Sequence, residues 1–516
     1  MKFNMNTINK KRKSIRRVSL GLCAALLLPL ASSSLHTAWA EPGKDQVQQK
    51  ERVLRIGSLW SGEDDTYFRQ QFTDLYEMKH PEVKLEIVPA IDSADLRFTP
   101  GSQAGAEGNL ESFRKLMGGD KPVDVIVGDS KLIKSLRDHN MLKPLQPLID
   151  RDHYDISNMA PTMLDGIREL GDGNLFALAP TFNSSALYYN KAIFDKAGLP
   201  YPTNGMTWDE VFTLAAKVVN ASKMTKVSGH PDSGIYGFSM SRYSSDPFWD
   251  MLSYISPLQL TMYDNKGEKM TVNNQQWKKA WTTYSELVHK GIIPGLGSTQ
   301  SVGNPESNGF NPLEGELFAT GKAAMVIGEY GYLKELADIE RNAAQIPNYK
   351  LVNWGIVSVP SFAEKPGVSS GTWLGNMMAI SANASNQEDA WDLIKFVNSN
   401  EVAKIKAHNS YELTSRKDYI TSSQPGLDLQ AFYTQKPLPA GDPAMDQLEA
   451  QKPGITQISD AGRQLFIEVY NGRQSVDRAL KTWESQGNKM LEKLRKSPSS
   501  TFDLEDGWIT QGAVRN

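Results

Sequence analysis

The stretch from Leu178 to Val218 constrains the fold most, because it combines a buried strand, a short helix and a well-marked helix start. Its apolar and aromatic run at 186–189 predicts a strand. A short helix is expected over 192–197, since a glycine and two prolines follow it. Thr207 and Glu210 have the spacing of a capping box, which predicts the start of a longer helix. Such close alternation of strand and helix predicts an α/β protein.

The chain before this stretch shows the same alternation. A strand at 53–60, a helix at 66–80 and a strand at 83–88 closed by Pro89 predict a right-handed parallel unit. A helix at 110–117 and a buried strand at 124–127 are expected next, with Gly128-Asp129-Ser130 capping a further helix. Open sheets of this kind hold ligands beyond the carboxyl ends of their strands, so Trp60 and Asp129 are predicted on one rim.

The rest of the chain continues as a mixture of helices and strands. The following elements are expected: a helix at 314–320, a buried strand at 323–327 leading to Glu329, strands at 354–357 and 373–381, and helices at 387–397 and 474–494. The strand at 373–381 is predicted to return to the first sheet. Trp391 and Trp483 are assigned to helix packing.

Residues 1–40 are predicted to form a secretory signal peptide. A basic segment at 10–17 precedes an apolar one at 20–31, and Ala38-Trp39-Ala40 fits a small-residue cleavage site. General secretion is favoured, with twin-arginine export at Arg16-Arg17 as the alternative. The only cysteine, Cys23, lies in this segment behind a leucine too large for lipoprotein cleavage. The mature protein is therefore expected outside the cytoplasm, extracellular or in the cell envelope (in the periplasm if the cell has an outer membrane), without a disulfide or a lipid anchor.

Removal of this segment also changes the charge of the chain. Its seven Lys or Arg and no acid turn the formal net charge of −3 into −10 for the mature chain. An acidic surface argues against nucleic acid or an anionic membrane as a partner. The seven histidines have no metal-ligand spacing and no phosphate-cradling loop is found, so neither a metal nor a cofactor is expected.

Four segments in fixed order resemble one known family. They are YYNKAIFDKAGLPYPTNGMTWDEVFTLAAKV from Tyr188, GKAAMVIGEYGYL from Gly321, VPSFAEKPGVSSGTWLGNMMAISANASNQEDAWDLIKFV from Val359 and YNGRQSVDRALKTWESQGNKML from Tyr470. They are similar to family 1 extracellular solute-binding proteins, the maltose-binding-protein-like receptors of ABC importers. The resemblance implies a two-lobed periplasmic-binding-protein fold, with discontinuous α/β domains joined by a hinge. It also implies a monomer that closes on its ligand and is recognised by the importer's membrane subunits.

The resemblance also suggests where the lobes begin and end. Lobe 1 is expected at 41–178 plus about 362–412, and lobe 2 at about 179–361 plus 413–516. Rotation is expected about chain crossings near Ala179-Pro180, Pro360 and Tyr411.

A sugar site needs flat rings for the apolar sugar faces and directional polar groups for the hydroxyls. The candidate rings are Trp60, Tyr188, Trp249, Tyr330 and Trp373, and the candidate polar partners are Asp129, Asn183, Asp246, Glu329 and Asn376. For each residue alone, core packing, capping or simple exposure competes with ligand contact. Trp60, Glu329, Tyr330 and Trp373 are favoured, because they stand in segments whose family counterparts face the cleft.

Two motifs suggest other chemistry. Gly367-Val368-Ser369-Ser370-Gly371 satisfies the G-x-S-x-G pattern of a hydrolase, but Pro366 precedes it and a predicted strand follows, where the hydrolase elbow needs a strand before and a helix after. Asp264-Asn265-Lys266-Gly267 could suggest calcium, but a two-stranded hairpin is favoured because the spaced oxygens of a calcium loop are missing.

The function predicted from the sequence is a non-enzymatic receptor that captures a carbohydrate, an oligosaccharide above all, for an ABC importer. The alternatives are a secreted carbohydrate-active enzyme, whose paired carboxylates a sequence does not reveal, and a binding protein for a non-sugar solute.

Overall fold

The computed structural model describes most of the chain after residue 51. Its described residues are 52–61, 64–92, 97–98, 108–224, 234–243, 246–296, 312–346, 349–409, 411–498, 500 and 502. The predicted signal peptide at 1–40 lies outside these residues. Among the described residues, no helix is long and apolar enough to cross a membrane.

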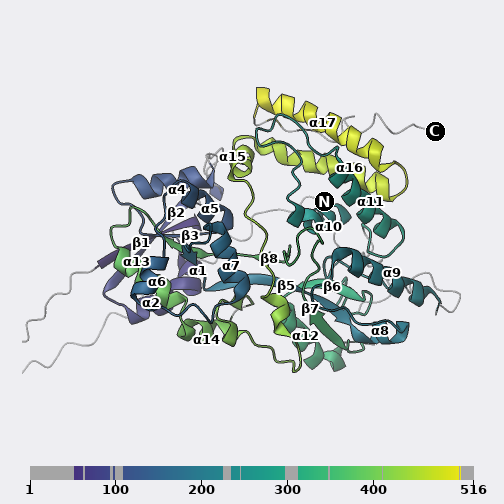
Figure 1. Cartoon of the computed structure of the whole chain (residues 1–516), viewed down its shortest axis with the longest axis horizontal. Coiled ribbons are helices and arrows are strands. Elements are labelled where there is room, and N and C mark those ends of the chain that lie inside the picture. Colours follow the sequence, from purple (N-terminus) through teal and green to yellow (C-terminus); the bar gives the residue numbers. More distant parts are fainter. Residues whose placement is uncertain are drawn as a thin grey trace, which may run out of the picture. The chain divides into compact units, whose positions relative to one another are not determined.

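The first sheet has five strands in the order β2-β1-β3-β9-β4 (Figure 1). The strands are β1 (Arg52–Ser61), β2 (Val83–Asp92), β3 (Val125–Gly128), β4 (Ala177–Leu178) and β9 (Met377–Ile380). β1 is parallel to both β2 and β3, whereas β9 is antiparallel to β3 and β4. The predicted parallel unit and the return of the chain near residue 380 are therefore confirmed.

The second sheet is built around one long strand, β5 (Thr181–Asn190). Its antiparallel partners are β6 (Met325–Glu329), β7 (Trp354–Val357), β8 (Thr372–Trp373) and β10 (Leu413–Thr414). Side chains of β5 alternate between two cores, with Ala186 and Tyr188 in one and Leu187 and Tyr189 in the other. This period of two is that of a strand buried on both faces.

Helices flank both sheets (Figure 1). The α-helices along the first part of the chain are α1 (Thr66–Phe68), α2 (Asp74–Lys79), α4 (Asn109–Gly118), α5 (Ser130–Asp138), α6 (Gln146–Arg151), α7 (Pro161–Leu170), α8 (Lys191–Ala197), α9 (Trp208–Met224), α10 (Pro247–Ile255) and α11 (Gln275–His289). The later ones are α12 (Tyr332–Arg341), α13 (Gln387–Val397), α14 (Asn400–Asn409), α15 (Pro443–Gln451), α16 (Gln457–Tyr470) and α17 (Val476–Lys496). A π-helical turn, Arg69–Thr73, joins α1 to α2.

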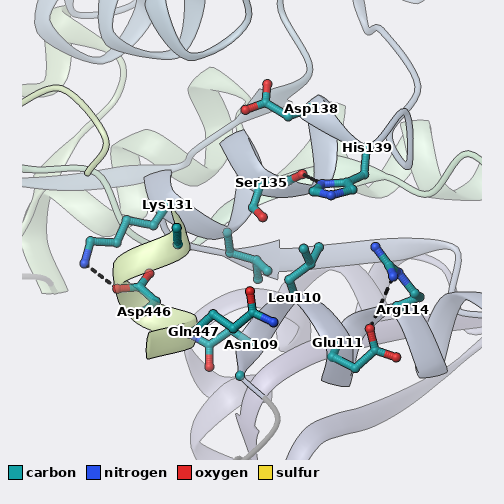
Figure 2. Close-up of a pocket in the computed structure, with 13 residues that line it drawn as sticks. Asn109, Leu110, Glu111, Arg114, Lys131, Ser135, Asp138, His139, Asp446 and Gln447 are labelled. Carbon is teal, nitrogen blue, oxygen red and sulfur yellow. Dashed lines mark hydrogen bonds and ion pairs between the residues drawn. The ribbon is translucent and has the colours of Figure 1, made fainter. Parts of the chain in front are cut away.

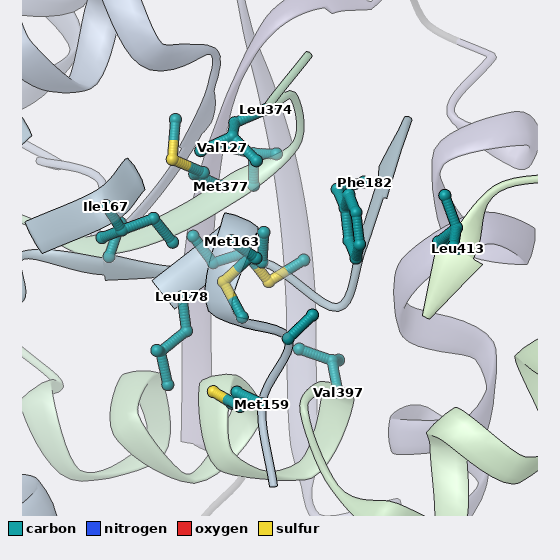
Figure 3. Packing of buried hydrophobic residues seen from close by; sticks show 14 of the residues in the cluster. Val127, Met159, Met163, Ile167, Leu178, Phe182, Leu374, Met377, Val397 and Leu413 are labelled. Atoms are coloured by element: carbon teal, nitrogen blue, oxygen red, sulfur yellow. The ribbon is translucent and has the colours of Figure 1, made fainter. Parts of the chain in front are cut away.

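The core around the first sheet joins side chains that are distant in sequence. In Figure 3, Val127 of β3, Met163 and Ile167 of α7 and Met377 of β9 lie around one apolar centre. The core of the other part is richer in large rings: Trp277, Trp281 and Trp483 are at most 1% exposed. Trp391 and Trp483 are both fully buried on helices, as predicted.

The local signals of the stretch from Leu178 to Val218 are confirmed. Gly198 ends α8 in the left-handed conformation, with φ of 64°. The backbone N–H and hydroxyl of Thr207 both donate to the Glu210 carboxylate, at 2.7 and 2.8 Å, and the Glu210 N–H donates back to the Thr207 hydroxyl. These bonds are those of a capping box, and α9 begins at the next residue, Trp208.

Three predicted elements are wrong in detail. No helix forms at 314–320, where turns surround Gly315 with φ of 79°. β2 runs through Pro89 instead of ending there, because β2 is an edge strand and can lack one N–H. The strand expected at 373–381 is divided into β8 and β9 by Asn376, which has φ of 52°.

That division carries the chain from one sheet to the other. β8 belongs to the second sheet and β9 to the first, so the passage falls at 374–376, beyond the predicted crossing at Pro360. Another passage falls at Ala179-Pro180, between β4 and β5, and a third lies between α14 and β10. The turn at 264–267 carries a single antiparallel bridge, Tyr263 to Met270, in keeping with a hairpin.

Candidate ligand-binding site

The carboxyl ends of β1 and β3 meet the start of β9 at one edge of the first sheet. Ser58 of β1 pairs with Val127, and the next residue of β3, Gly128, pairs with Met377. Trp60, near the end of β1, Asp129, directly after β3, and Asn376, directly before β9, are therefore at the same edge. The backbone positions of Trp60 and Asp129 therefore lie on one rim of the sheet, as predicted.

Asp129 has a structural role at this edge. Its side chain caps α5 and accepts the N–H of Leu132 at 2.9 Å. A capping aspartate keeps an extended backbone and directs the first turn of the helix away from the strand. Lys131 and Lys134 are thereby placed on the helix directly beside the strand end.

Trp373 is a large ring that the fold leaves uncovered. The residue is 49% exposed and pairs through β8 with Asn183 of β5. A Cβ atom on Gly375 would lie 2.0 Å from Cη2 of Trp373, so the indole lies directly against the Gly375 backbone. A half-exposed ring supported by the backbone of its own chain is suited to stack on a ligand.

Asp129 and Trp373 line the same cavity, of about 400 Å³, which we call the Trp373 cavity. Its apolar wall is formed by Trp373, Leu374 and the segment 437–441, and its polar lining includes Asp129, Lys131, Lys134, Glu169 and Gln259. The wall is fixed, because a Cβ on Gly166 of α7 would lie 2.5 Å from Pro437 and 2.8 Å from Leu374. A mostly apolar pocket with a few polar groups is the usual form of a small-molecule site.

Lys131 is one of the charged residues that line this cavity. Its Nζ lies 2.8 Å from Oδ1 of Asp446 on α15. Burial acts to lower the pKa of Lys131, but the hydrogen bond to Asp446 and the nearby carboxylates of Glu449 and Asp129 outweigh it, so the pKa is raised. Lys131 is therefore a firmly charged cation at neutral pH.

The predicted residues of β5 and β6 have different surroundings. Asn183 donates through Nδ2 to Glu412 at 3.2 Å, and Glu329 is exposed at the end of β6. Tyr188 is fully buried and its hydroxyl donates to the backbone carbonyl of Glu329 at 3.0 Å. Tyr330 is 6% exposed and donates to the carbonyl of Thr421 at 2.6 Å. Both tyrosines are thus used in packing, and burial raises the pKa of each hydroxyl.

Asp246 and Trp249 lie at the start of α10. Asp246 caps this helix, accepting the N–H of Phe248 at 2.9 Å, and forms an ion pair with Arg463 of α16. Trp249 is 42% exposed and its ring packs edge-on against Phe248. Neither residue lines the Trp373 cavity.

The structure thus brings Asp129 and Trp373 into one cavity, and the other predicted residues whose side chains are described do not line it. Lys131, Lys134 and Gln259 also line the cavity, as does the wall at 437–441, and none of these residues was predicted from the sequence as a site residue. Lys131 could have been predicted from the sequence, because it follows Asp129 by two residues at the same strand end. The wall at 437–441 could not have been predicted, since no local pattern marks Pro437 as a neighbour of Gly166.

The hydrolase motif has neither of its required neighbours. Ser369 is 1% exposed, lies in a loop, and its hydroxyl accepts the N–H of Gly371 at 2.9 Å. A nucleophile elbow needs an exposed serine between a strand and a helix. Across the described ranges, no cluster of three or more His, Cys, Asp or Glu is placed to hold a metal ion.

Comparison with known families decides the class of this fold. The family model for the bacterial extracellular solute-binding protein matches residues 60–404, about two thirds of the chain. The chain belongs to this family. Its members are extracytoplasmic solute-binding proteins, so the predicted family and the coarse functional class are confirmed.

Two curated relatives extend the match. The chain is 24% identical over 378 residues to an sn-glycerol-3-phosphate-binding periplasmic protein of Shigella dysenteriae, covering 69% of this chain and 78% of that protein. It is 23% identical over 496 residues to a putative binding protein of Brucella abortus, covering 93% of this chain and all of the relative.

Solved structures agree on the fold. A sugar transporter from Rhizobium etli in an open conformation has a TM-score of 0.53 at 22% identity, covering 85% of this chain and 99% of that one. The sugar-binding protein MalE from Xanthomonas citri has a TM-score of 0.52 at 19% identity, covering 86% and 98%. The predicted two-lobed periplasmic-binding-protein fold is confirmed.

Proposed function

We propose that this solute-binding protein captures a carbohydrate between its two lobes and presents it to the membrane subunits of an ABC importer. The observation that carries the proposal is the half-exposed Trp373 ring, supported by Gly375 at the edge of a cavity of about 400 Å³. Sugar rings have apolar faces that stack on aromatic rings, while their hydroxyls need groups such as Asp129, Glu169 and Gln259. A relative of known structure is named a sugar transporter and another a sugar-binding protein.

The proposed lobes follow the two sheets. With the passage at 374–376 in place of the boundary expected near 362, lobe 1 is taken as 41–178 plus about 376–412, and lobe 2 as about 179–375 plus 413–516. The hinge is proposed at the passages between the sheets, near Ala179-Pro180, 374–376 and Tyr411, where few residues need to change conformation for the lobes to rotate. No bond is made or broken, and the closed form is what the importer recognises. The active unit is a monomer.

The proposed location rests on the leader segment at 1–40 and on the absence of cysteine from the rest of the chain. Residues 1–40 act as the signal peptide, and the mature chain has no cysteine for a lipid anchor. The protein is then released outside the cytoplasm, and it stays in the periplasm where an outer membrane exists.

A thermal screen tests the function. The mature chain is heated with single sugars and linear oligomers of glucose, mannose, galactose, xylose and arabinose. A ligand that binds only the folded state at 100 times its Kd stabilises that state by about 2.7 kcal/mol, so one or a few sugars are expected to raise the melting temperature. Chromatography of the same mixtures should recover every sugar intact. Release of shorter sugars would instead support the secreted enzyme.

A phosphate-bearing solute is the second candidate. Lys131 and Lys134 line the Trp373 cavity, and the relative from Shigella dysenteriae is named for sn-glycerol-3-phosphate. Phosphate groups bind lysine ammonium groups as point charges. Stabilisation by glycerol phosphates with no response to any sugar would replace the carbohydrate proposal with this one.

A further inference from the structure

A second cavity adjoins the Trp373 cavity at Lys131. It has a volume of about 390 Å³ and is enclosed by α4, α5 and α15. Figure 2 shows Asn109 and Gln447 on one side of the space and Ser135 and His139 on the other. We call it the Gln447 cavity.

One residue, Lys131, is common to the described linings of the two cavities. Lys131 lines both of them and reaches across to Asp446, with 2.8 Å between Nζ and Oδ1 (Figure 2). A Cβ on Gly441 would lie 3.4 Å from Cε of Lys131, so the wall of the Trp373 cavity lies directly against the lysine stem. The Lys131–Asp446 ion pair therefore lies where the two cavities adjoin, and we call it the partition.

The partition is weak enough to open. The side chain of Lys131 is 47% exposed and that of Asp446 is 30% exposed. Ion pairs with this exposure contribute about 0–1 kcal/mol, since water screens the attraction and both side chains lose conformational freedom. Contact with a ligand replaces such a pair at little cost.

The linings of the two cavities complement each other chemically. The Trp373 cavity offers a ring, Leu374 and prolines, whereas the Gln447 cavity offers the amides of Asn109 and Gln447 and the pair of Arg114 and Glu111, 3.4 Å apart. Amide, guanidinium and carboxylate groups provide donors and acceptors for hydroxyls. Each cavity alone is near the lower end of the roughly 300–1,000 Å³ of ligand sites.

The third wall of the Gln447 cavity, α15, lies outside the residues that the family model matches. The family match ends at residue 404, whereas α15 begins at Pro443. α15 is anchored by Leu448, which is 6% exposed in the core that contains Trp483, and it reaches α5 through Asp446. Part of the lining of this cavity therefore comes from a segment outside the matched region.

We propose that the two cavities are subsites of one elongated site, and that a carbohydrate of at least two rings spans them after displacing the Lys131–Asp446 pair. One ring stacks on Trp373 and the next is held by hydrogen bonds in the Gln447 cavity. This inference rests on the proposed carbohydrate function and adds the length of the ligand and the partition that it opens.

The inference is tested by calorimetric measurement of affinity as a function of the length of the sugar oligomer. The mature protein is titrated with oligomers of one to five units of the sugars used in the thermal screen. Affinity is expected to rise at least tenfold from one unit to the oligomer that fills both subsites, and to change little beyond it. Affinity independent of length would overturn the inference and leave the carbohydrate receptor intact. If no sugar of any length binds, the proposed function itself fails, and the inference fails with it.

Two variants test whether the gain in affinity with sugar length arises in the Gln447 cavity. Gln447→Trp fills the second cavity, and it is expected to remove the gain with length while the affinity for the single unit stays within twofold. Gln451→Trp is the matched control on the same helix, because Gln451 is exposed and does not line the cavity. Equal weakening of short and long sugars by Gln447→Trp would contradict a separate subsite.

Asp446→Asn tests the partition without added bulk. Removal of the charge leaves Lys131 unpaired at this position, so the long oligomer no longer has to break the ion pair. Its affinity is expected to rise by up to about fivefold while that of the single unit is unchanged. A loss of affinity for the long oligomer would show that Asp446 itself holds the ligand or the fold, and would overturn the gating role.

Discussion

Trp373 is the residue on which the proposed stacking contact depends. Trp373→Ala removes a half-exposed ring, so stability should change little while the ligand loses most of its apolar contact. Burial of a ring of this size contributes about 1.5–3 kcal/mol, so the Kd for the sugar is expected to rise at least tenfold in calorimetry. Tyr67→Ala is a suitable control, because Tyr67 is 75% exposed on α1 and does not line the Trp373 cavity. An unchanged Kd in Trp373→Ala would remove the stacking contact from the account.

Gly375 tests the placement of that ring separately from its presence. In Gly375→Ala the new methyl group would occupy a point 2.0 Å from Cη2 of Trp373, so the indole has to move. We expect a weaker affinity for the sugar, with the ring still present and its fluorescence changed. Gly118→Ala is the matched control, because nothing lies within 4 Å of the added Cβ. Equal affinities in the two variants would show that the indole position is not important.

Residue types alone did not distinguish the rings that contact solvent from those that pack. Tyr188 and Trp373 both stand on strands of the second sheet, yet Tyr188 is fully buried and Trp373 is half exposed. β5 is covered on both faces, so neither its odd-numbered nor its even-numbered residues face water. The alternation of side chains along β5 therefore does not predict which of them are exposed. Trp373 stands on the short strand β8, three residues before Asn376, whose left-handed conformation is not evident from the sequence.

At the scale of elements, α16 and α17 pack closely against α11, where Trp277, Trp281 and Trp483 meet. A Cβ on Gly462 of α16 would lie 2.4 Å from Cε2 of Trp483, whose Nε1 donates to the Ile458 carbonyl at 2.8 Å. Gly462→Ala is therefore expected to overpack this contact and lower the free energy of unfolding by about 1–3 kcal/mol. Denaturant titration checks this value. An unchanged midpoint of unfolding would mean that α16 and α17 can move apart enough to accommodate the added methyl group without loss of stability.

The capping box of α9 makes a prediction about pH. Hydrogen bonds from the backbone and then the side chain of Thr207 lower the pKa of Glu210 below its ordinary value. A carboxyl with a lowered folded pKa stabilises the fold above its unfolded pKa of about 4.3, and the contribution is lost as the pH falls through the folded pKa. Glu210→Gln should thus melt earlier than the unaltered chain at pH 7, and the difference should disappear in acid. A difference that persists at pH 2 would assign the effect to something other than the charge.

Most elements of the first sheet could be predicted from the sequence, because short apolar runs bounded by Gly, Pro and capping residues specify them locally. The failures have physical causes that are not local. Gly315 adopts a left-handed conformation and prevents a helix at 314–320, and edge position allows β2 to pass through Pro89. Lys131 and Asp446 are far apart in the sequence, so no local pattern could predict their contact or the cavity beside it.

For the whole molecule, the central claim is that two lobes close on a sugar. The passages at Ala179-Pro180, 374–376 and Tyr411 are the places where the chain changes sheets, so rotation about them moves one sheet relative to the other. The buried cluster around the first sheet also contains Ala186, Tyr188 and Val326 from the second sheet, so the hinge passages run beside a core that the two sheets share.

Small-angle X-ray scattering of the mature chain, with and without a sugar that raises its melting temperature, tests this claim most directly. We expect a smaller radius of gyration with sugar at a few times the Kd of the unaltered chain, and a much smaller change in Trp373→Ala at the same concentration, because its higher Kd leaves most of that variant unbound. An identical scattering profile with and without bound sugar, at a concentration where calorimetry shows full occupancy, would contradict it.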